Sequence, residues 1–277
     1  MMWMNMTNET LGQAKFNGDL TAAIAEAVSQ IGGFNRFVAA GDRVLLKPNC
    51  NTADAYPASS DPAFVAAVAD VCRAAGAGEI TVADSSTMAA NTTHVMRRMG
   101  LTRLAEARPW LKVVSFDDGR WIPRQAKHGR YLKRVSVPAS LDVFSKVIFL
   151  PCLKTHKYAR YTGALKLAVG LMRSQERLLL HAGHLQEKIA ELASIIRPHL
   201  VIMDARRCFI TGGPFFGDVR EPKLIIAGRN RVDMDIAGVK IIQQYPGNSL
   251  ADVVPTELPQ IRRARELGVD AEPLVVA

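Results

Sequence analysis

The chain has 277 residues, a formal net charge of +9 and 48% apolar residues, enough to bury one large core or two smaller ones. Its apolar runs are shorter than the roughly 18 residues that a membrane-spanning helix needs, which argues against an integral helical membrane protein. The amino terminus lacks the pattern of a secretory signal, and the four cysteines are scattered without a CxxC pair. We therefore expect reduced thiols, no membrane partner and a cytoplasmic location.

Short apolar runs alternate with helical patterns along the chain. Strands are expected at 43–49, 79–86 and 112–118, with helices at 60–78 and at 91–107, the latter broken at Gly100. Further strands are expected at 146–151, 199–205 and 222–228, with a long amphipathic helical region at 175–198. The alternation predicts an α/β fold in which a mostly parallel sheet carries helices on both faces. We expect residues 1–277 to form a single domain, with two lobes as the alternative.

Charged or hydrogen-bonding side chains follow five of the predicted strands. In chain order they are Lys47 and Asn49; Asp84, Ser85 and Ser86; Lys154 and His156; Asp204 and Arg206; and Arg229, Asp233 and Asp235. In open α/β sheets, ligands bind outside the carboxyl ends of the strands. The pattern predicts one polar cleft at that edge, against the alternative that these strands merely end where the chain meets water.

The segment 154–172, KTHKYARYTGALKLAVGLM, concentrates cationic side chains beside the predicted cleft. We interpret KTHKYAR as a loop at a strand end, in which Lys154, His156 and Arg160 face an anion. Lys166 is expected in the first turns of a helix that begins near Thr162. Its neighbours are apolar, so burial would lower the pKa of its amine and suit it to act as a nucleophile, base or anion anchor. A solvated helical lysine is the alternative.

Glycines and histidines add weaker candidates. Gly212 and Gly213 in TGGPFFG suit an anion-binding nest of backbone amides or, equally, a tight turn. His181 and His184 are three residues apart, so on one helix they would share a face and suit metal ligation, although Gly183 between them weakens the helix. No Walker, GxGxxG or GxSxG pattern is present, which argues against a P-loop ATPase, a Rossmann dehydrogenase and a standard serine hydrolase.

The basic stretch 120–134, RWIPRQAKHGRYLKR, precedes an expected strand at RVSVP. It is interpreted as a solvated loop or, alternatively, as a lid over an anionic ligand. Taken over the whole chain, aromatic side chains do not interleave the basic residues as they do in single-strand nucleic-acid binders, so a nucleic-acid partner is less favoured than a small anionic ligand. The sequence leaves the oligomeric state open.

Several segments in a fixed order give the chain a family resemblance. LLKPN, AGAGEITVADSS, LPCLKTHKYARYTGALKLAVGL, LLHAGH, IMDA, GGPFFG and RNRVDMDIAG together resemble domain-of-unknown-function family three-six-two, over about residues 43–245. Members are often described as iron–sulfur proteins because many carry a ferredoxin-like cysteine cluster. The cysteines here have no such spacing, so we expect no iron–sulfur cluster.

A more distant similarity concerns the catalytic domain of the lactate racemase family, which holds a nickel-pincer nucleotide. The matching positions here are His156, Lys166 in TGALK, and His181 or His184. The resemblance implies that the lysine anchors the cofactor and that histidines, with His156 and His184 as the candidate pair, ligate a divalent metal or move the substrate proton. The racemase motif is richer in glycine and serine around its lysine.

These observations favour an enzyme that acts on an anionic small molecule bearing a carboxylate or phosphate. Its expected chemistry is acid–base or metal-assisted, with His156, Lys166, His181 and His184 as the catalytic candidates. The binding candidates are Lys47, Asn49, Asp84, Ser85, Lys154, Arg160, Asp204, Arg206, Gly212 and Gly213. The alternative is a non-catalytic module that binds a ligand or a redox partner through its basic surface. The sequence does not identify a substrate or a reaction, although an isomerase-like or oxidoreductase-associated activity fits the resemblances.

Overall fold

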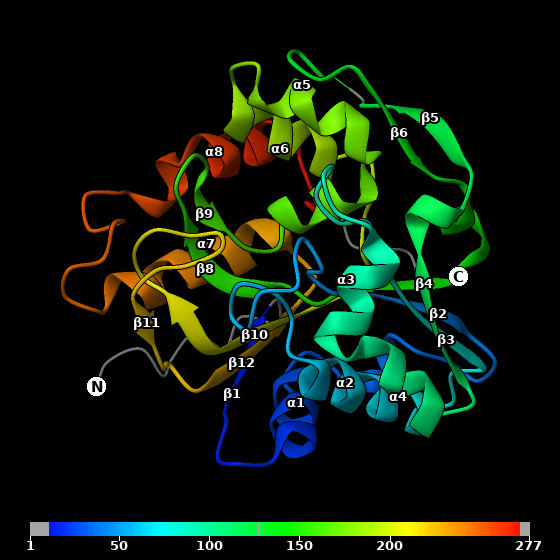
Figure 1. Ribbon diagram of the computed structural model, residues 1–277. Helices are drawn as coiled ribbons and strands as arrows, with labels where there is room; N and C mark the ends of the chain where they lie inside the picture. The colour runs from blue at the N-terminus through cyan, green and yellow to red at the C-terminus, as the bar shows by residue number, and fades with distance from the viewer. Residues whose placement is uncertain (1–10, 127, 272–277) are drawn as a thin grey trace.

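A computed structural model describes residues 11–126 and 128–271, and it has the predicted α/β architecture (Figure 1). The main sheet has the strand order β1-β12-β10-β7-β2-β3-β4, formed by Leu11–Lys15, Leu224–Gly228, Leu200–Phe209, Lys146–Phe149, Arg43–Lys47, Glu79–Asp84 and Leu111–Ser115. The neighbours from β10 to β4 are parallel, whereas β12 is antiparallel to both β10 and β1. The prediction of a mostly parallel sheet is therefore confirmed.

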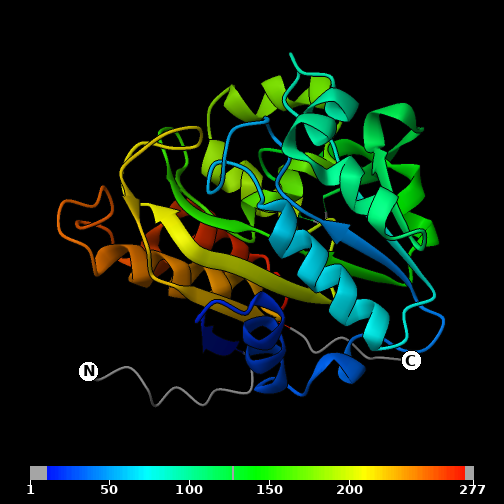
Figure 2. The same ribbon diagram turned by 60° about the horizontal axis from the view of Figure 1, so that its bottom comes forward.

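Two apolar cores lie on the two faces of this sheet. One face packs against helices α1 (Leu20–Ser29), α2 (Pro62–Ala74), α3 (Thr92–Met99) and α4 (Leu101–Ala107). The other packs against α6 (Leu185–Ala193), α7 (Arg231–Gln243) and α8 (Pro259–Glu266). Figures 1 and 2 show these two helical layers on opposite sides of the strands. Strands buried on both faces read as continuous apolar runs, as RVLLK and LIIAG do.

The helix boundaries follow the capping residues in the sequence. Asp61 accepts a hydrogen bond from the amide of Ala63 at the start of α2, where Pro62 occupies the first helical position. Asn91 caps α3 in the same way. Gly100 separates α3 from α4 with a φ of 89°, a conformation that glycine adopts without strain. The predicted break at this glycine is confirmed.

The helical region expected at 175–198 is divided. A 3₁₀ helix, η5 (Ser174–Arg177), leads into the short α5 (Leu178–His181), and α6 begins only at Leu185. Gly183 and His184 both have positive φ, at 75° and 53°, which interrupts the helix. The helical region expected at 175–198 is therefore present but interrupted, at the glycine that the sequence indicated as a weak point of the helix.

The segment that contains Lys154 forms a β-hairpin rather than a strand-end loop. β8 (Cys152–His156) and β9 (Arg160–Thr162) pair antiparallel, with His156 opposite Arg160. The chain then enters a 3₁₀ helix, η4 (Lys166–Leu171), so the helix expected near Thr162 begins later and is tighter. β10 bridges the sheet and the hairpin, since it pairs with β7 at Leu200 and with β8 at Asp204 and Phe209.

The remaining elements lie at the edges of the fold. β5 (Trp121–Gln125) and β6 (Arg134–Pro138) form a separate antiparallel pair, which includes the strand expected at RVSVP. β11 (Val219–Arg220) pairs with the end of β10. Short 3₁₀ helices occur at Phe34–Arg36 (η1), Phe116–Asp118 (η2), Ala139–Val143 (η3) and Pro255–Glu257 (η6). Within the described ranges, the structure contains no helix of the length and apolarity required to cross a bilayer.

Candidate functional site

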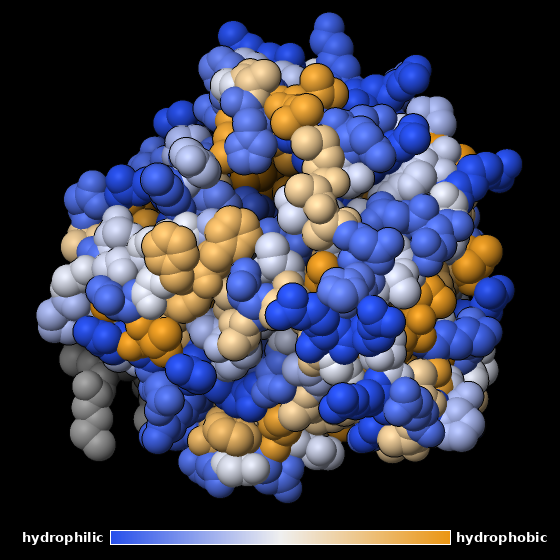
Figure 3. All heavy atoms as spheres, viewed as in Figure 1, coloured by the Kyte–Doolittle hydropathy of each residue, from blue (hydrophilic) through white to orange (hydrophobic). Residues whose placement is uncertain are grey.

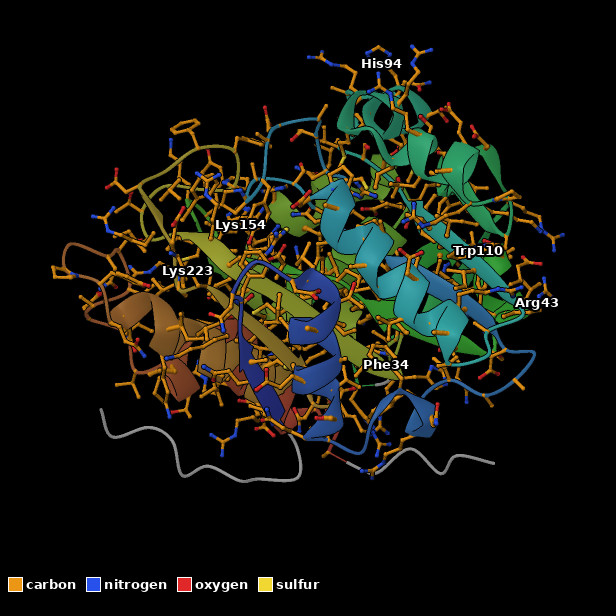
Figure 4. All side chains as sticks on the ribbon, turned by 90° about the horizontal axis from the view of Figure 1, so that it is seen from below. Phe34, Arg43, His94, Trp110, Lys154 and Lys223 are labelled. Atoms are coloured by element: carbon orange, nitrogen blue, oxygen red, sulfur yellow. The ribbon has the colours of Figure 1, made fainter. Side chains whose placement is uncertain are left out.

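A pocket opens where the carboxyl ends of β2 and β3 meet the β8–β9 hairpin. The unfilled space within and in front of it measures about 520 Å³, a volume that includes open solvent. Its polar lining comes from six segments: Lys47, Asn49, Asn51, Asp84, Ser85, Lys154, Thr162, Lys166 and Arg177. Figure 4 shows Lys154 and Arg43, at the amino end of β2, on opposite sides of the molecule, as the strand directions require. The pocket therefore lies at the edge of the sheet where the polar cleft was predicted.

Lys47 and Asp84 form a buried ion pair at the base of the pocket. The Lys47 Nζ lies 2.7 Å from the Asp84 Oδ1, and the side chains are 1% and 3% exposed. Asp84 also accepts hydrogen bonds from the amides of Cys50 and Ser85, both at 2.7 Å. Gly170 lies directly against this pair, and a Cβ there would overlap the Asp84 carboxylate. A residue without a side chain is therefore needed at this position of η4, next to the Lys47–Asp84 ion pair that β2 and β3 supply.

Lys154 and Lys166 bring positive charge to the pocket without a carboxylate bonded to either. The Lys154 Nζ donates to the carbonyl of Ala58, and burial lowers the pKa of this amine to about 8. Lys166 makes no hydrogen bond or ion pair with the described residues. Burial, followed by the charges of Lys154 and Arg177, lowers its pKa to about 7. Lys154 is buried and Lys166 is half-buried, and neither amine has a bonded counterion.

Arg177 is a lining residue that sequence reasoning missed. Its guanidinium donates to the carbonyl oxygens of Met172 (2.9 and 3.0 Å), Ser85 (3.0 Å) and Ser86. Burial lowers its pKa, although arginine stays charged at any physiological pH. It sits in a region read only as amphipathic helix, so no local pattern marked it. The lining contains four cations and one carboxylate, which leaves the pocket strongly positive.

His156 lies beside the pocket but is not part of its lining. Its Nδ1 accepts hydrogen bonds from the amides of Tyr158 and Ala159, each at 3.1 Å, which leaves the proton of the neutral ring on Nε2. Burial, then the charges of Lys166 and Lys154, lowers the pKa of this imidazole to about 2. His156 is therefore neutral at physiological pH and suited to donate a hydrogen bond.

His181 and His184 are exposed and do not line the pocket. His181 makes an edge contact with the ring of Tyr158, with centroids 6.2 Å apart. His184 stacks on Tyr131, 4.0 Å away, in the basic stretch 120–134. The shared helical face expected for the two histidines is absent because α5 ends at His181 and α6 begins after His184.

The structure shows little that fits a metal bound by His156 and His184. His156 is buried with its Nδ1 already engaged, whereas His184 is half exposed and stacked on Tyr131. Across residues 11–126 and 128–271, no three His, Cys, Asp or Glu side chains are grouped as metal ligands. Lys166 alone matches what the nickel-pincer resemblance requires, so we derive no chemical step through that cofactor.

Arg160, Asp204 and Arg206 have partners elsewhere. Arg160 donates to Asp252 at 2.8 Å, and both side chains are exposed. Asp204 is buried and accepts from Arg206 and from the Tyr56 hydroxyl, which lies 2.6 Å away. Arg206 also pairs with Asp61 at 2.7 Å. We interpret these three residues as structural because their charges are already matched outside the pocket lining.

The fifth predicted strand end lies at the opposite edge of the sheet. β12 is antiparallel to β10, and Gly228 pairs with Val201 near the start of β10, so Arg229 and Asp233 are away from the pocket. Asp235 returns along α7 and accepts from the amides of Ala164 (2.6 Å) and Leu165 (3.1 Å). This buried carboxylate fixes the backbone that leads to Lys166. Burial raises the pKa of Asp235 to about 7.

The glycine pair behaves as a tight turn. Gly212 and Gly213 have φ values of 65° and 68°, and the Gly213 amide donates to the carbonyl of Phe216 at 2.7 Å, so this amide is not free to bind an anion. A Cβ on Gly213 would overlap the carbonyl of Thr155 in β8. The close approach places Pro214 in the pocket wall.

The basic stretch 120–134 is held away from the pocket. The amides of Arg130, Tyr131 and Leu132 donate to the Glu191 carboxylate on α6, at 2.7–2.9 Å. None of its described residues lines the pocket. The four cysteines are reduced and buried. Burial raises the pKa of the pocket thiol of Cys152 to about 11, which makes it a poor nucleophile.

Comparison with known proteins identifies the family. The model of the family described as Domain of unknown function (DUF362) matches residues 44–240, and the chain belongs to this family. A protein named thylakoid-associated protein sll1697, from Synechocystis sp. (strain ATCC 27184 / PCC 6803 / Kazusa), is 30% identical over 253 residues, which cover 88% of this chain and 75% of that protein. The family resemblance inferred from the sequence motifs is confirmed.

Proposed function

We propose that this member of the DUF362 family binds an anionic small molecule, bearing a carboxylate or a phosphate, in the pocket at the carboxyl ends of β2 and β3. One observation carries the proposal: Lys154 and Lys166 both line the pocket, and neither is bonded to a carboxylate. Buried charges in proteins are normally paired. An anionic ligand would supply the missing partner, and the adjacent Arg177 would add to its attraction.

The proposed chemistry centres on Lys166. A pKa of about 7 leaves a large fraction of this amine neutral at physiological pH, so it is available as a base or as a nucleophile toward a carbonyl carbon. His156, with its proton on Nε2, would donate a hydrogen bond to an oxygen of the ligand rather than accept a proton. Asn51 would orient the ligand as an uncharged partner, whereas the Asn49 side-chain amide and the Ser85 hydroxyl already donate to the Ala58 carbonyl (3.2 Å) and to Asp117 (2.8 Å).

Binding is tested by calorimetric titration with sulfate and inorganic phosphate. Lys154→Met and Lys166→Met should each weaken binding by about tenfold or more, because each removes one charge next to the anion. Arg160→Met is the matched control, since this cation lies outside the lining and pairs with Asp252. Equal affinity for sulfate in wild type and both lysine variants would contradict the proposal.

A binding module without catalysis is the second candidate. The observation that favours it is the state of His156, whose pKa of about 2 removes it as a general base near neutral pH. The two candidates differ in the reactivity of Lys166. Treatment with a small keto acid and cyanoborohydride should trap a covalent adduct on Lys166, located by peptide mass spectrometry. Modification no faster than that of exposed lysines such as Lys133 would favour the binding module.

A further inference from the structure

We infer that the ligand is amphiphilic: its anionic head enters the pocket, and its apolar tail lies on a rim of exposed apolar side chains around the mouth. We define the apolar rim as Met88, Tyr158, Leu178, Leu179, Phe215 and Phe216. The inference rests on the proposed function, because the head group is the anion that the pocket lysines would bind. It adds a substrate class to that site.

The rim residues are unusually exposed for their size. Phe216 is 78% exposed, Tyr158 65% and Leu178 61%. Single exposed apolar side chains are common on protein surfaces, whereas a group of them in one place marks a binding site. Nine large apolar side chains are exposed in the described part of the chain, and six of them belong to this rim. Most of the exposed large apolar side chains of the described residues therefore belong to the rim.

Each rim residue is close in sequence to a residue that lines the pocket. Leu178 and Leu179 follow Arg177, and Phe215 and Phe216 follow Pro214. Tyr158 lies at the turn of the β8–β9 hairpin that carries Lys154, and Met88 lies in the loop after Ser85. The same four segments thus supply the polar wall and the apolar mouth.

Contacts between these segments hold the parts of the chain that carry the rim residues next to one another. The Lys157 amide donates to the carbonyl of Gly213 at 3.1 Å, which joins the hairpin turn to the loop of Phe215 and Phe216. The ring of Tyr158 meets His181 at the end of α5. Arg177 bonds to the carbonyls of Ser85 and Ser86, which joins the start of α5 to the loop after β3.

Figure 3 shows the result on the surface. Apolar side chains gather over α5, over the loop between β10 and β11 and over the loop that follows β3, around a hollow in this face of the molecule. A cationic pocket surrounded by apolar side chains complements a molecule with one charged end and one hydrophobic end. A small, wholly polar anion would leave the rim exposed to water.

The test uses a series of monoalkyl phosphates, namely methyl, butyl and hexyl phosphate, at one pH and at concentrations at which they are monomeric. The head group is constant, so only contact with the tail changes along the series. We expect the dissociation constant to fall by about two- to fourfold for each methylene that the rim covers. In the double variant Phe215→Ala/Phe216→Ala, the loss of affinity should grow with chain length.

Val143→Ala is the control variant. Val143 is as exposed as Phe215, at 45%, but it lies in η3 before the amino end of β7, at the far edge of the sheet. This variant should retain the wild-type dependence on chain length. Equal affinities for methyl and hexyl phosphate, with methyl phosphate still bound, would overturn the inference and leave the proposed function intact.

Two other outcomes are informative. Failure of methyl phosphate and sulfate to bind at all would remove the proposed function itself, and the inference with it. Gain of affinity only when the alkyl phosphate is embedded in phosphatidylcholine vesicles, and not as a monomer, would overturn the ligand assignment and indicate a membrane-facing rim. A gain with free monomers in the absence of vesicles supports the inference.

Discussion

Replacement of Lys166 by methionine should make the protein more stable. Lys166 is half-buried in the pocket wall, its ammonium lies near the charges of Lys154 and Arg177, and it has no bonded counterion in the described residues. A pKa lowered from 10.5 to about 7 corresponds to a preference for the neutral amine of about 5 kcal/mol. The pocket admits water, so this is an upper limit, and we expect an increase of about 1–3 kcal/mol in the free energy of unfolding at pH 6. Methionine has a similar length and leaves little empty space.

The dependence of stability on pH distinguishes removal of the unpaired Lys166 charge from better packing of the methionine side chain. Because the pKa is lower in the folded state than in the unfolded state, the unfolded chain binds more protons between about pH 7 and 10.5. Wild-type stability should therefore rise with pH across this window, and the advantage of Lys166→Met should shrink from pH 6 to pH 9. Urea unfolding at both pH values measures this difference. Lys133→Met, at an exposed lysine, should change stability by less than about 0.5 kcal/mol. A destabilised Lys166→Met, or an advantage that does not shrink with pH, would refute the reasoning.

Three further predictions concern the same pocket. Asp84→Asn should reduce the free energy of unfolding by about 3–5 kcal/mol because it leaves the buried Lys47 charge unpaired. The control Asp142→Asn, which breaks the exposed pair with Arg124, should reduce it by less than about 1 kcal/mol, and urea unfolding measures both. Gly170→Ala should destabilise the protein and weaken sulfate binding, since its Cβ would displace the Asp84 carboxylate; unchanged sulfate affinity would contradict this. Sulfate remains a dianion from pH 6 to 9 while the two unpaired lysines lose their charges, so calorimetry should show the affinity fall by about tenfold or more from pH 7 to 9. A flat profile would contradict the role of the two lysines.

Much of the fold was predictable because local signals agreed with the tertiary arrangement. The helices expected at 60–78 and 91–107 and the break at Gly100 appear in the structure close to where the sequence placed them, and their first residues follow the caps Asp61 and Asn91. The reversal of β12 was not predictable, since an apolar run such as LIIAG reads the same in a parallel or an antiparallel position. The strand β1 and the helix α1 were not predicted.

The sequence predicted where the pocket lies better than it predicted which residues line it. Lys47, Asp84 and Lys154 follow parallel strands, and strand direction alone brings them to one edge. Asp204 follows a strand as well, yet its charge is used by Arg206, and pairing between side chains is invisible in a single sequence. Arg177 reaches the pocket from a 3₁₀ turn that no pattern distinguishes from helix. The direction of a strand follows from the topology of the sheet, whereas the side chain with which a charged residue pairs depends on tertiary contacts.

The length of β10 has a consequence for how a ligand enters. Its first residues belong to the central sheet beside β7, and its later residues hold the β8–β9 hairpin that carries Lys154. β8 pairs with β10 at Asp204 and at Phe209, with an irregularity in register between them, so we expect this wall to move less than the loops at the mouth and its amides to exchange with solvent more slowly than theirs. If the proposed ligand binds, its arrival and departure would then depend on the side chains and loops at the mouth. The wall formed by the β8–β9 hairpin would then be rigid, and the apolar rim at the mouth would be adjustable. Substitutions of Phe215 and Phe216 would therefore be the most direct way to change which sizes of ligand the pocket accepts.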